Sequence, residues 1–287
     1  MQSGWRRLVA LLICLMLVAG ISLAAAEAVS VSDPEPLFQF HQIEVGMGQA
    51  HLVVYGDWGI MIDGGLPNEE TWGKVKPYLE ACGIRYLKAY IATHWHLDHT
   101  GNMNPILEML ANDETVVYGS SEVVYEAKEP IGGGHYEQMK VGDVIRFGPV
   151  TLSCIGPGTV SEAGRVNRDS LNIIISYGSR RFMITGDFVN SRLVYDTYEE
   201  LLPGIDVFQF PHHGLRNYCV DPFVLLKMKP SYVLVPGNGA FRPKEYFLNF
   251  GFRSKWLDNG SGNIVFLTDG ESLELYTKAG PGDFAGR

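Results

Sequence analysis

The stretch THWHLDHTG, residues 93–101, places three of the chain's eight histidines and one aspartate within six consecutive positions. It follows the apolar run LKAYIAT, residues 87–93, which is typical of a buried strand. A folded core gains little from adjacent imidazoles, whereas imidazole nitrogens and carboxylate oxygens are ligands for zinc, iron and manganese. The stretch therefore predicts a metal site at the end of a strand, with a histidine-rich surface loop as the alternative.

The spacing within this stretch allows the side chains to converge. Alternate side chains of an extended segment lie on the same face, so His94 and His96 point the same way. A turn after Leu97 then brings Asp98 and His99 back towards them. We expect these two aspects of the spacing to gather all four polar side chains around one site.

Polar residues also follow three other predicted strands. Asp63 ends GIMID, Asp187 ends RRFMITGD, and His212 and His213 follow VFQFP. Taken singly, Asp63 is typical of a turn, Asp187 of a helix N-cap, and a histidine of a hydrogen-bonded structural residue. Taken with the first cluster, they predict one metal site that several strand ends build on a rigid scaffold.

The rest of the chain alternates between short apolar runs and amphipathic segments, without repeats or low-complexity tracts. Such alternation predicts one α/β domain in which mixed sheets form a sandwich with helices outside. The expected strands are 38–46, 51–56, 59–63, 87–93, 115–119, 143–148, 150–156, 171–178, 180–187, 205–210, 231–237 and a hairpin over 263–276, and the expected helices are 68–83, 104–113, 191–202, 221–228 and 245–257.

Composition and the N-terminal segment limit the possible functions. The chain has 287 residues, 46% hydrophobic and 19% charged, with a net charge of −9, which excludes a disordered chain and a broad, stable nucleic-acid surface. Residues 1–26 combine two arginines, an apolar run and small residues, the order of a secretory signal peptide. We expect a secreted protein with a short linker at 27–36, one folded domain at 37–287 and no transmembrane segment after cleavage. An uncleaved membrane anchor is the alternative.

Four motifs in this order resemble those of the metallo-β-lactamase superfamily. They are IMIDGG (60–65), HWHLDH (94–99), FMITGD (182–187) and FPHHG (210–214). Within the superfamily, IEVGMGQAHLV (43–53) and VNRDSLNIII (166–175) resemble the hydrolase domain of ComEC-type competence proteins and their secreted stand-alone relatives. The resemblance implies a four-layer αββα sandwich over residues 37–278.

The same resemblance implies a role for each site residue. The first metal would be held by His94 and His96, and the second by Asp98, His99 and one of the paired histidines, His213. Asp187 would bridge the two metals. Asp98 and Asp63 would serve catalysis. Asp98, or alternatively a histidine next to the metal ligands, would pass a proton to the leaving group, and Asp63 would orient a ligand or the nucleophilic water.

The chain departs from the superfamily pattern at three places. Most members have a third first-site histidine about twenty residues before the bridging aspartate, where this chain has Asn167 and Ser170. These two residues and His212 are therefore further candidates for binding or supporting a metal, whereas His135 is expected to play no part. Leu215 stands where relatives have serine, and a later loop that often carries histidine has Arg242 instead.

The reaction implied is hydrolysis with two divalent ions, Zn or Mn. Such a pair, ~3.5–4 Å apart, shares a hydroxide as the nucleophile and polarises the bond to be cleaved. We expect an anionic substrate, small or polymeric, with a phosphodiester from nucleic acid or the cell envelope. Phosphate oxygens could bind Arg165, Arg168, Arg180 or Arg242. The alternatives are a carbonyl hydrolase acting on a lactam or lactone, and a catalytically idle metal-binding protein of the same fold.

Overall fold

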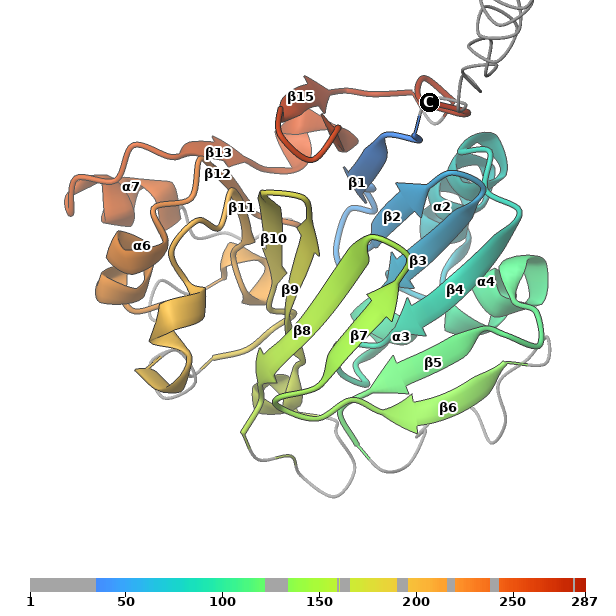
Figure 1. The fold of residues 1–287 in the computed structure, drawn as a ribbon, viewed down its shortest axis with the longest axis horizontal. Coiled ribbons are helices and arrows are strands. Elements are labelled where there is room, and N and C mark those ends of the chain that lie inside the picture. Colours follow the sequence, from blue (N-terminus) through green and yellow to red (C-terminus); the bar gives the residue numbers. More distant parts are fainter. Residues whose placement is uncertain are drawn as a thin grey trace, which may run out of the picture. The chain divides into compact units, whose positions relative to one another are not determined.

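Two mixed β-sheets face each other in the computed structural model, which describes residues 35–121, 134–158, 160, 166–189, 196–215, 220–237, 243–280 and 282–287 (Figure 1). One sheet has the order β15-β14-β1-β2-β3-β4-β5-β6 and the other β13-β12-β11-β10-β9-β8-β7. The strands are β1 Phe38–Gln42, β2 His51–Tyr55, β3 Trp58–Ile62, β4 Tyr86–Ile91, β5 Val116–Gly119, β6 His135–Gln138, β7 Val144–Phe147, β8 Val150–Gly156, β9 Asn172–Tyr177, β10 Arg180–Ile184, β11 Val207–Gln209, β12 Tyr232–Leu234, β13 Lys255–Leu257, β14 Ile264–Thr268 and β15 Glu274–Thr277.

The core between the sheets explains why these runs are strands. Alternate residues of β1, β2 and β3 face the second sheet, and they meet the inward residues of β8, β9 and β10. Phe40 packs on Phe182 with ring centroids 5.0 Å apart, which joins the two sheets near their centre. Because strand side chains alternate between faces, the other residues of the same strands point outward and pack against helices.

Helices cover both outer faces of the sandwich. In the described residues they are α2 Glu69–Ala81, α3 Leu97–Thr100, α4 Met103–Leu110, α6 Pro222–Met228 and α7 Pro243–Leu248. One outer core joins α2 and α4 to the first sheet, and another joins α6 and α7 to the second. The four layers are thus helix, sheet, sheet, helix, and the predicted αββα sandwich is confirmed.

Pairing between strands places the predicted ligands at one edge. Strands β3 and β4 run parallel in the first sheet, and β10 and β11 run parallel in the second. Asp63 and His94 follow the ends of the first pair, and Asp187 and His212 follow the ends of the second. The carboxyl ends of all four strands therefore supply polar residues to the same loop-built region.

Several predicted elements differ from the observed ones. The predicted helix 245–257 is wrong in its second half, because α7 ends at Leu248 and residues Lys255–Leu257 form β13, paired in parallel with β12. The predicted strand 38–46 ends at Gln42, and β6 was not expected. Of the predicted helix 191–202, residues 191–195 lie outside the described part, and Glu199–Leu201 form a 3₁₀ turn. The signal segment 1–26 and linker residues 27–34 lie outside the described part too.

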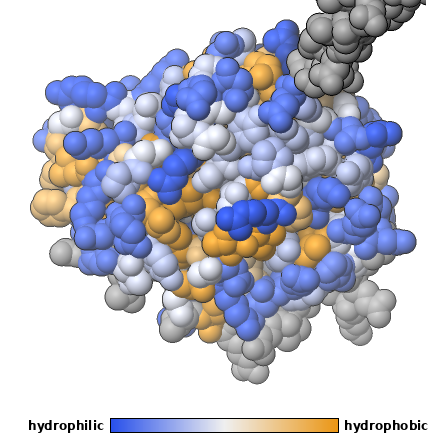
Figure 2. Space-filling model, viewed as in Figure 1, coloured by the Kyte–Doolittle hydropathy of each residue, from blue (hydrophilic) through white to orange (hydrophobic). Residues whose placement is uncertain are grey.

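The face shown in Figure 2 is mostly polar, with apolar colour near its middle and at its left outline, where α6 and α7 lie in Figure 1. Strand β7 is the edge of its sheet, and its Val144 is 50% exposed. None of the described helices has both the length and the apolar composition needed to cross a membrane.

Candidate metal centre

The turn predicted after Leu97 is present. His96 adopts an extended conformation, and α3 begins at the next residue. The backbone N–H groups of His99 and Thr100 both donate to the His96 carbonyl, each at 3.0 Å. This short helix returns Asp98 and His99 towards His94, with the His94 and His99 ring centroids 4.2 Å apart.

One group of potential ligands contains Asp98, His99, Asp187 and His213. Each offers one atom, and these atoms all lie within 4.8 Å of one another. His213 Nε2 lies 3.1 Å from Asp98 Oδ2 and 3.4 Å from Asp187 Oδ1, and His99 Nε2 lies 3.2 Å from Asp187 Oδ1. The group joins residues that lie more than 100 positions apart in the sequence, as predicted from the strand ends.

A second group contains His94, His96 and Asp187, again within 4.8 Å. His94 Nε2 lies 3.9 Å from Asp187 Oδ2. The Nε2 atoms of His99 and His213 lie near the other carboxylate oxygen, Oδ1. Asp187 thus belongs to both groups and faces each with a different oxygen. This is the arrangement expected of a carboxylate that bridges two cations.

Asp63 lies beneath the cluster and holds His99. Its Oδ2 accepts hydrogen bonds from His99 Nδ1 and Thr93 Oγ1, both at 2.7 Å, and its Oδ1 accepts one from Thr93 N at 2.8 Å. The Asp63 side chain is fully buried. Of the two roles predicted for Asp63, these contacts fit the orientation of a ligand rather than of a water. Thr93 was not predicted, although its position beside the first ligand was a usable signal.

The cluster carries buried polar atoms that lack a hydrogen-bond partner among the described residues. His94 Nε2, His99 Nε2, His213 Nε2 and Asp187 Oδ1 are buried and have no hydrogen-bond partner among the described residues. Unpartnered buried polar atoms are rare because each costs free energy. Here they converge from three imidazoles and one carboxylate, a donor set that suits Zn²⁺ or Mn²⁺. The residues therefore fit the metal pair that the motifs imply.

The charges in the cluster shift its pKa values strongly. Burial alone would lower the pKa of His99, but the charges of Asp187 and Asp63 raise it well above its ordinary value. Burial likewise opposes the change at His213, whose pKa rises to about 9 beside Asp187 and Asp98. Burial and the nearby charge of His99 lower the pKa of His94. In the absence of metal, protons on imidazoles thus balance the carboxylates, and a cation would replace them.

Asn167 and Ser170, in the region where most superfamily members have a third histidine, contact different parts of the cluster. Asn167 Nδ2 donates to His212 Nε2 at 3.0 Å, and His212 Nε2 lies 3.9 Å from Asp187 Oδ2. Ser170 Oγ accepts a hydrogen bond from Asp187 N at 3.1 Å. Ser170 therefore positions the Asp187 backbone, whereas His212 brings an imidazole to the same carboxylate oxygen that His94 approaches.

Two glycines allow the surrounding loops to approach the ligands. Gly48 has φ +108°, and a Cβ there would collide with the Asp98 carbonyl oxygen. Gly237 has φ +91°, and a Cβ there would lie 2.8 Å from His213 Cβ. Asn259 joins these loops by donating to Gly46 O at 2.9 Å and accepting from Gly237 N at 3.0 Å. The sequence analysis did not identify Asn259.

Of the four arginines predicted as phosphate contacts, the described residues include Arg168 and Arg180. Arg180 begins β10, at the end opposite Asp187, and its Nη1 donates to Asp206 Oδ1 at 3.1 Å. Arg168 is exposed on the 3₁₀ turn beside Asn167. Arg165 and Arg242 lie outside the described residues. His135 is exposed on β6 and pairs with Glu137 at 3.0 Å, away from both ligand groups.

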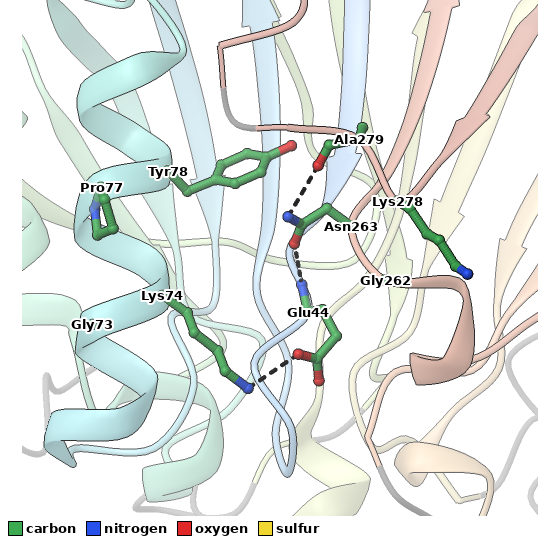
Figure 3. A pocket seen from close by; sticks show the side chains of 9 residues that line it. All are labelled: Glu44, Gly73, Lys74, Pro77, Tyr78, Gly262, Asn263, Lys278 and Ala279. Carbon is green, nitrogen blue, oxygen red and sulfur yellow. Dashed lines mark hydrogen bonds and ion pairs between the residues drawn. The ribbon is translucent and has the colours of Figure 1, made fainter.

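A separate pocket of about 380 Å³ contains none of the clustered ligands. It lies between α2 and the chain segments around Asn263 and Lys278 (Figure 3). Lys74 Nζ lies 3.0 Å from Glu44 Oε2, and Asn263 links Glu44 N to the Ala279 carbonyl. The Lys74 charge is thus already paired, and the pocket offers no acid–base group comparable to the metal cluster.

Comparison of the sequence with known proteins gives two competence-related relatives. Recombination protein 2 of Haemophilus influenzae is 23% identical over 219 residues, 74% of this chain and 26% of that protein. ComE operon protein 3 of Bacillus subtilis is 27% identical over 171 residues, 55% of this chain and 21% of that protein. The chain spans about a quarter of the length of these relatives, in line with the predicted resemblance to one of their domains.

The fold also matches solved structures. The metallo-β-lactamase fold protein YhfI of Bacillus subtilis superposes with a TM-score of 0.58 at 14% identity, covering 81% of this chain and all of that one. In sequence, the family model for the metallo-β-lactamase superfamily matches residues 43–238, which include every residue of the two ligand groups. The chain therefore belongs to the metallo-β-lactamase superfamily, as a metal-dependent hydrolase of that fold.

Proposed function

We propose that the chain is a phosphodiesterase that requires two divalent ions, Zn²⁺ or Mn²⁺. The observation that carries this proposal is the membership of Asp187 in both ligand groups. A shared carboxylate keeps two cations close together, and close pairs recur in phosphatases and nucleases, where they hold the attacking and leaving oxygens of a phosphoryl transfer. The coarser activity, metal-dependent hydrolysis, does not depend on this choice of substrate.

The first ion would be held by His94, His96 and Asp187, and the second by Asp98, His99, Asp187 and His213. When bound, such ions lower the pKa of a water they share towards ~7 and polarise the phosphoryl oxygen. Asp63 orients His99 through the hydrogen bond to Nδ1, so that Nε2 faces Asp187. This orientation is the contribution of Asp63 to catalysis.

Asp98 is the proposed proton carrier. Burial opposes ionisation, but His213 and His99 lower the pKa of Asp98 to about 2, so the carboxylate is charged at neutral pH. Its side chain is 26% exposed and therefore reaches the open side of the cluster. In the reaction, the water oxygen bonds to phosphorus and the phosphorus–oxygen bond to one alcohol breaks. Asp98 takes up the water proton and passes it to that alcohol, leaving a phosphate monoester.

Arg168 is the proposed contact for a phosphate oxygen. It is exposed and adjoins Asn167, whose amide reaches His212 in the cluster. A guanidinium binds phosphate oxygens through charge-assisted hydrogen bonds and keeps its charge at any physiological pH. We also propose that the enzyme acts outside the cytoplasm, on the basis of the signal-like order in residues 1–26. Mass spectrometry of the extracellular fraction should then find an N-terminus close to Glu27.

The test of the activity combines metal analysis with a substrate panel. The purified chain is loaded with Zn²⁺ or Mn²⁺, the metal per chain is counted, and turnover is measured on bis-p-nitrophenyl phosphate, single-stranded DNA, a cephalosporin and a lactone. We expect about two ions per chain and turnover of bis-p-nitrophenyl phosphate. Turnover of only the cephalosporin or the lactone would identify a carbonyl hydrolase, and metal without turnover would identify an idle metal-binding protein.

A further inference from the structure

Four large apolar side chains are exposed beside the metal cluster. The described residues contain nine exposed large hydrophobic side chains, and Met47, Leu97, Val166 and Leu215 are among them, at 45%, 50%, 40% and 37%. Each lies within two positions in the chain of a ligand-group residue, or of a residue that contacts Asp98 or His212. We call these four residues the apolar rim. Exposed apolar side chains that gather around a site mark a binding surface.

Met47 and Leu97 lie on two segments that touch each other. The loop that carries Met47 packs against the backbone of Asp98, because Gln49 N donates to Asp98 O at 3.0 Å and Gly48 lies against the same oxygen. Leu97 directly precedes Asp98 in the chain. One side of the apolar rim is thus fixed to the ligand group that contains Asp98.

Val166 and Leu215 lie on a second pair of touching segments. Val166 precedes Asn167, whose side-chain amide donates to His212 Nε2 at 3.0 Å. Leu215 N donates to the His212 carbonyl at 2.8 Å, which closes the turn that holds the paired histidines. This other side of the apolar rim is fixed to His212.

The two sides of the apolar rim are linked through the residues of the cluster. His213, next to His212 in the chain, lies 3.1 Å from Asp98 Oδ2. The Asp98 and His212 side chains are 26% and 19% exposed, whereas those of His94, His99 and Asp187 are almost fully buried. Solvent therefore reaches the cluster where Asp98, His212 and the half-buried His96 lie, and the apolar rim adjoins these residues.

We propose that the apolar rim binds an alkyl chain esterified to the phosphate, so that the substrate class is alkyl phosphodiesters. This rests on the proposed phosphodiesterase function. All four side chains of the rim are aliphatic, and none offers the aromatic face on which nucleobases stack. Branched and flexible aliphatic side chains instead cover the CH₂ groups of a chain and remove them from water. Hydrolysis would break the phosphorus–oxygen bond to the other alcohol, leaving the alkyl phosphate and that alcohol.

The test uses a series of alkyl p-nitrophenyl phosphates with methyl, butyl and octyl chains, hydrolysed by the metal-loaded full chain. We expect kcat/KM to rise at least roughly tenfold from methyl to octyl, because burial of about two CH₂ groups suffices for that change. A series with no dependence on chain length would overturn the proposal. So would faster hydrolysis of thymidine 5′-(p-nitrophenyl phosphate) than of the octyl ester, which would identify a nucleobase as the bound group.

Variants connect the chain-length dependence to the apolar rim. Met47→Ser and Leu215→Ser should each reduce the rise in kcat/KM from the methyl to the octyl ester. Leu215→Met, which keeps a large apolar side chain, should preserve that rise. Leu226→Ser is the matched control, because Leu226 is a 40% exposed leucine on α6, outside the rim. Metal per chain is measured for every variant. A rise in kcat/KM that persists in both serine variants with full metal content would contradict the role of the rim.

Binding separates this proposal from the proposed function. Calorimetry with methylphosphonate and octylphosphonate measures the effect of the chain without any turnover. Tighter binding of octylphosphonate that is lost in Leu215→Ser would support the rim even if no phosphodiester were hydrolysed, and the proposed function alone would then fail. Equal affinity for the two phosphonates would overturn the rim proposal, whatever the activity.

Discussion

Asp63 Oδ2 lies 2.7 Å from His99 Nδ1, and this hydrogen bond determines which nitrogen of His99 faces the cluster. The carboxylate accepts a hydrogen bond from Nδ1–H of His99. The other ring nitrogen, Nε2, therefore faces Asp187 Oδ1. Thr93 holds the same carboxylate through its backbone and its hydroxyl. The orientation of one ligand thus depends on a buried aspartate at the end of another strand.

Asp63→Asn should weaken metal binding without removing a ligand. The amide has about the same size as the carboxylate, but it lacks the charge that favours Nδ1–H on His99. Loss of such a support typically costs ~10–100-fold in metal affinity. Competition with a chromophoric chelator gives the dissociation constant, and Asp57→Asn, at a partly exposed aspartate outside both ligand groups, serves as the control. An unchanged affinity in a folded Asp63→Asn protein would show that His99 keeps its orientation without Asp63.

Replacement of Asp187 should have the largest effect on metal content. Because Asp187 belongs to both ligand groups, Asp187→Ala removes one ligand from each ion at once. We expect loss of most of both metals and of nearly all turnover, measured as metal per chain and as kcat on the best panel substrate. Activity close to wild type in this variant would mean that the two groups do not form a shared site.

Asp98→Ala should divide the two metal sites. Asp98 belongs to one ligand group only, so a metal should remain at His94 and His96. The nucleophile would no longer be activated by the pair, and the rate should fall on the order of 10²- to 10⁴-fold. His135→Ala should have no effect, because His135 is exposed and pairs with Glu137. Loss of activity in His135→Ala would contradict the assignment of the active site to the two ligand groups.

The paired histidines should differ in which metal they affect. His213 lies with Asp98 and His99, so His213→Ala should lower the occupancy of the second site. His212 Nε2 lies 3.9 Å from Asp187 Oδ2, as His94 Nε2 does, so His212→Ala should weaken the first site instead. Titration with Co²⁺, followed by its visible absorption, resolves the two binding steps. Loss of the same step in both variants would contradict this division.

The sequence predicts which polar side chains converge better than it predicts some of the elements that surround them. The spacing from His94 to His99 has one local solution, an extended pair followed by a turn, and the observed α3 provides it. The short strand Lys255–Leu257 was missed because only its pairing with β12 makes it a strand. Likewise, the contact of Asn167 with His212 joins residues 45 positions apart, and no local pattern specifies it.

Acidification should destabilise the metal-free protein through its buried neutral histidines. His41 is buried between Tyr78 and Gln39, and desolvation lowers its pKa to about 3. The unfolded chain takes up a proton near pH 6.5 but the folded chain does not, so stability is complete above that pH and falls as the pH drops towards 3. At pH 5 the loss from His41 amounts to ~2 kcal/mol. Urea unfolding with a chelator at pH 7.5 and pH 5 should therefore show a smaller loss in His41→Gln than in wild type, whereas the exposed His135→Gln should match wild type. Equal losses in all three proteins would show that His41 can be protonated within the fold.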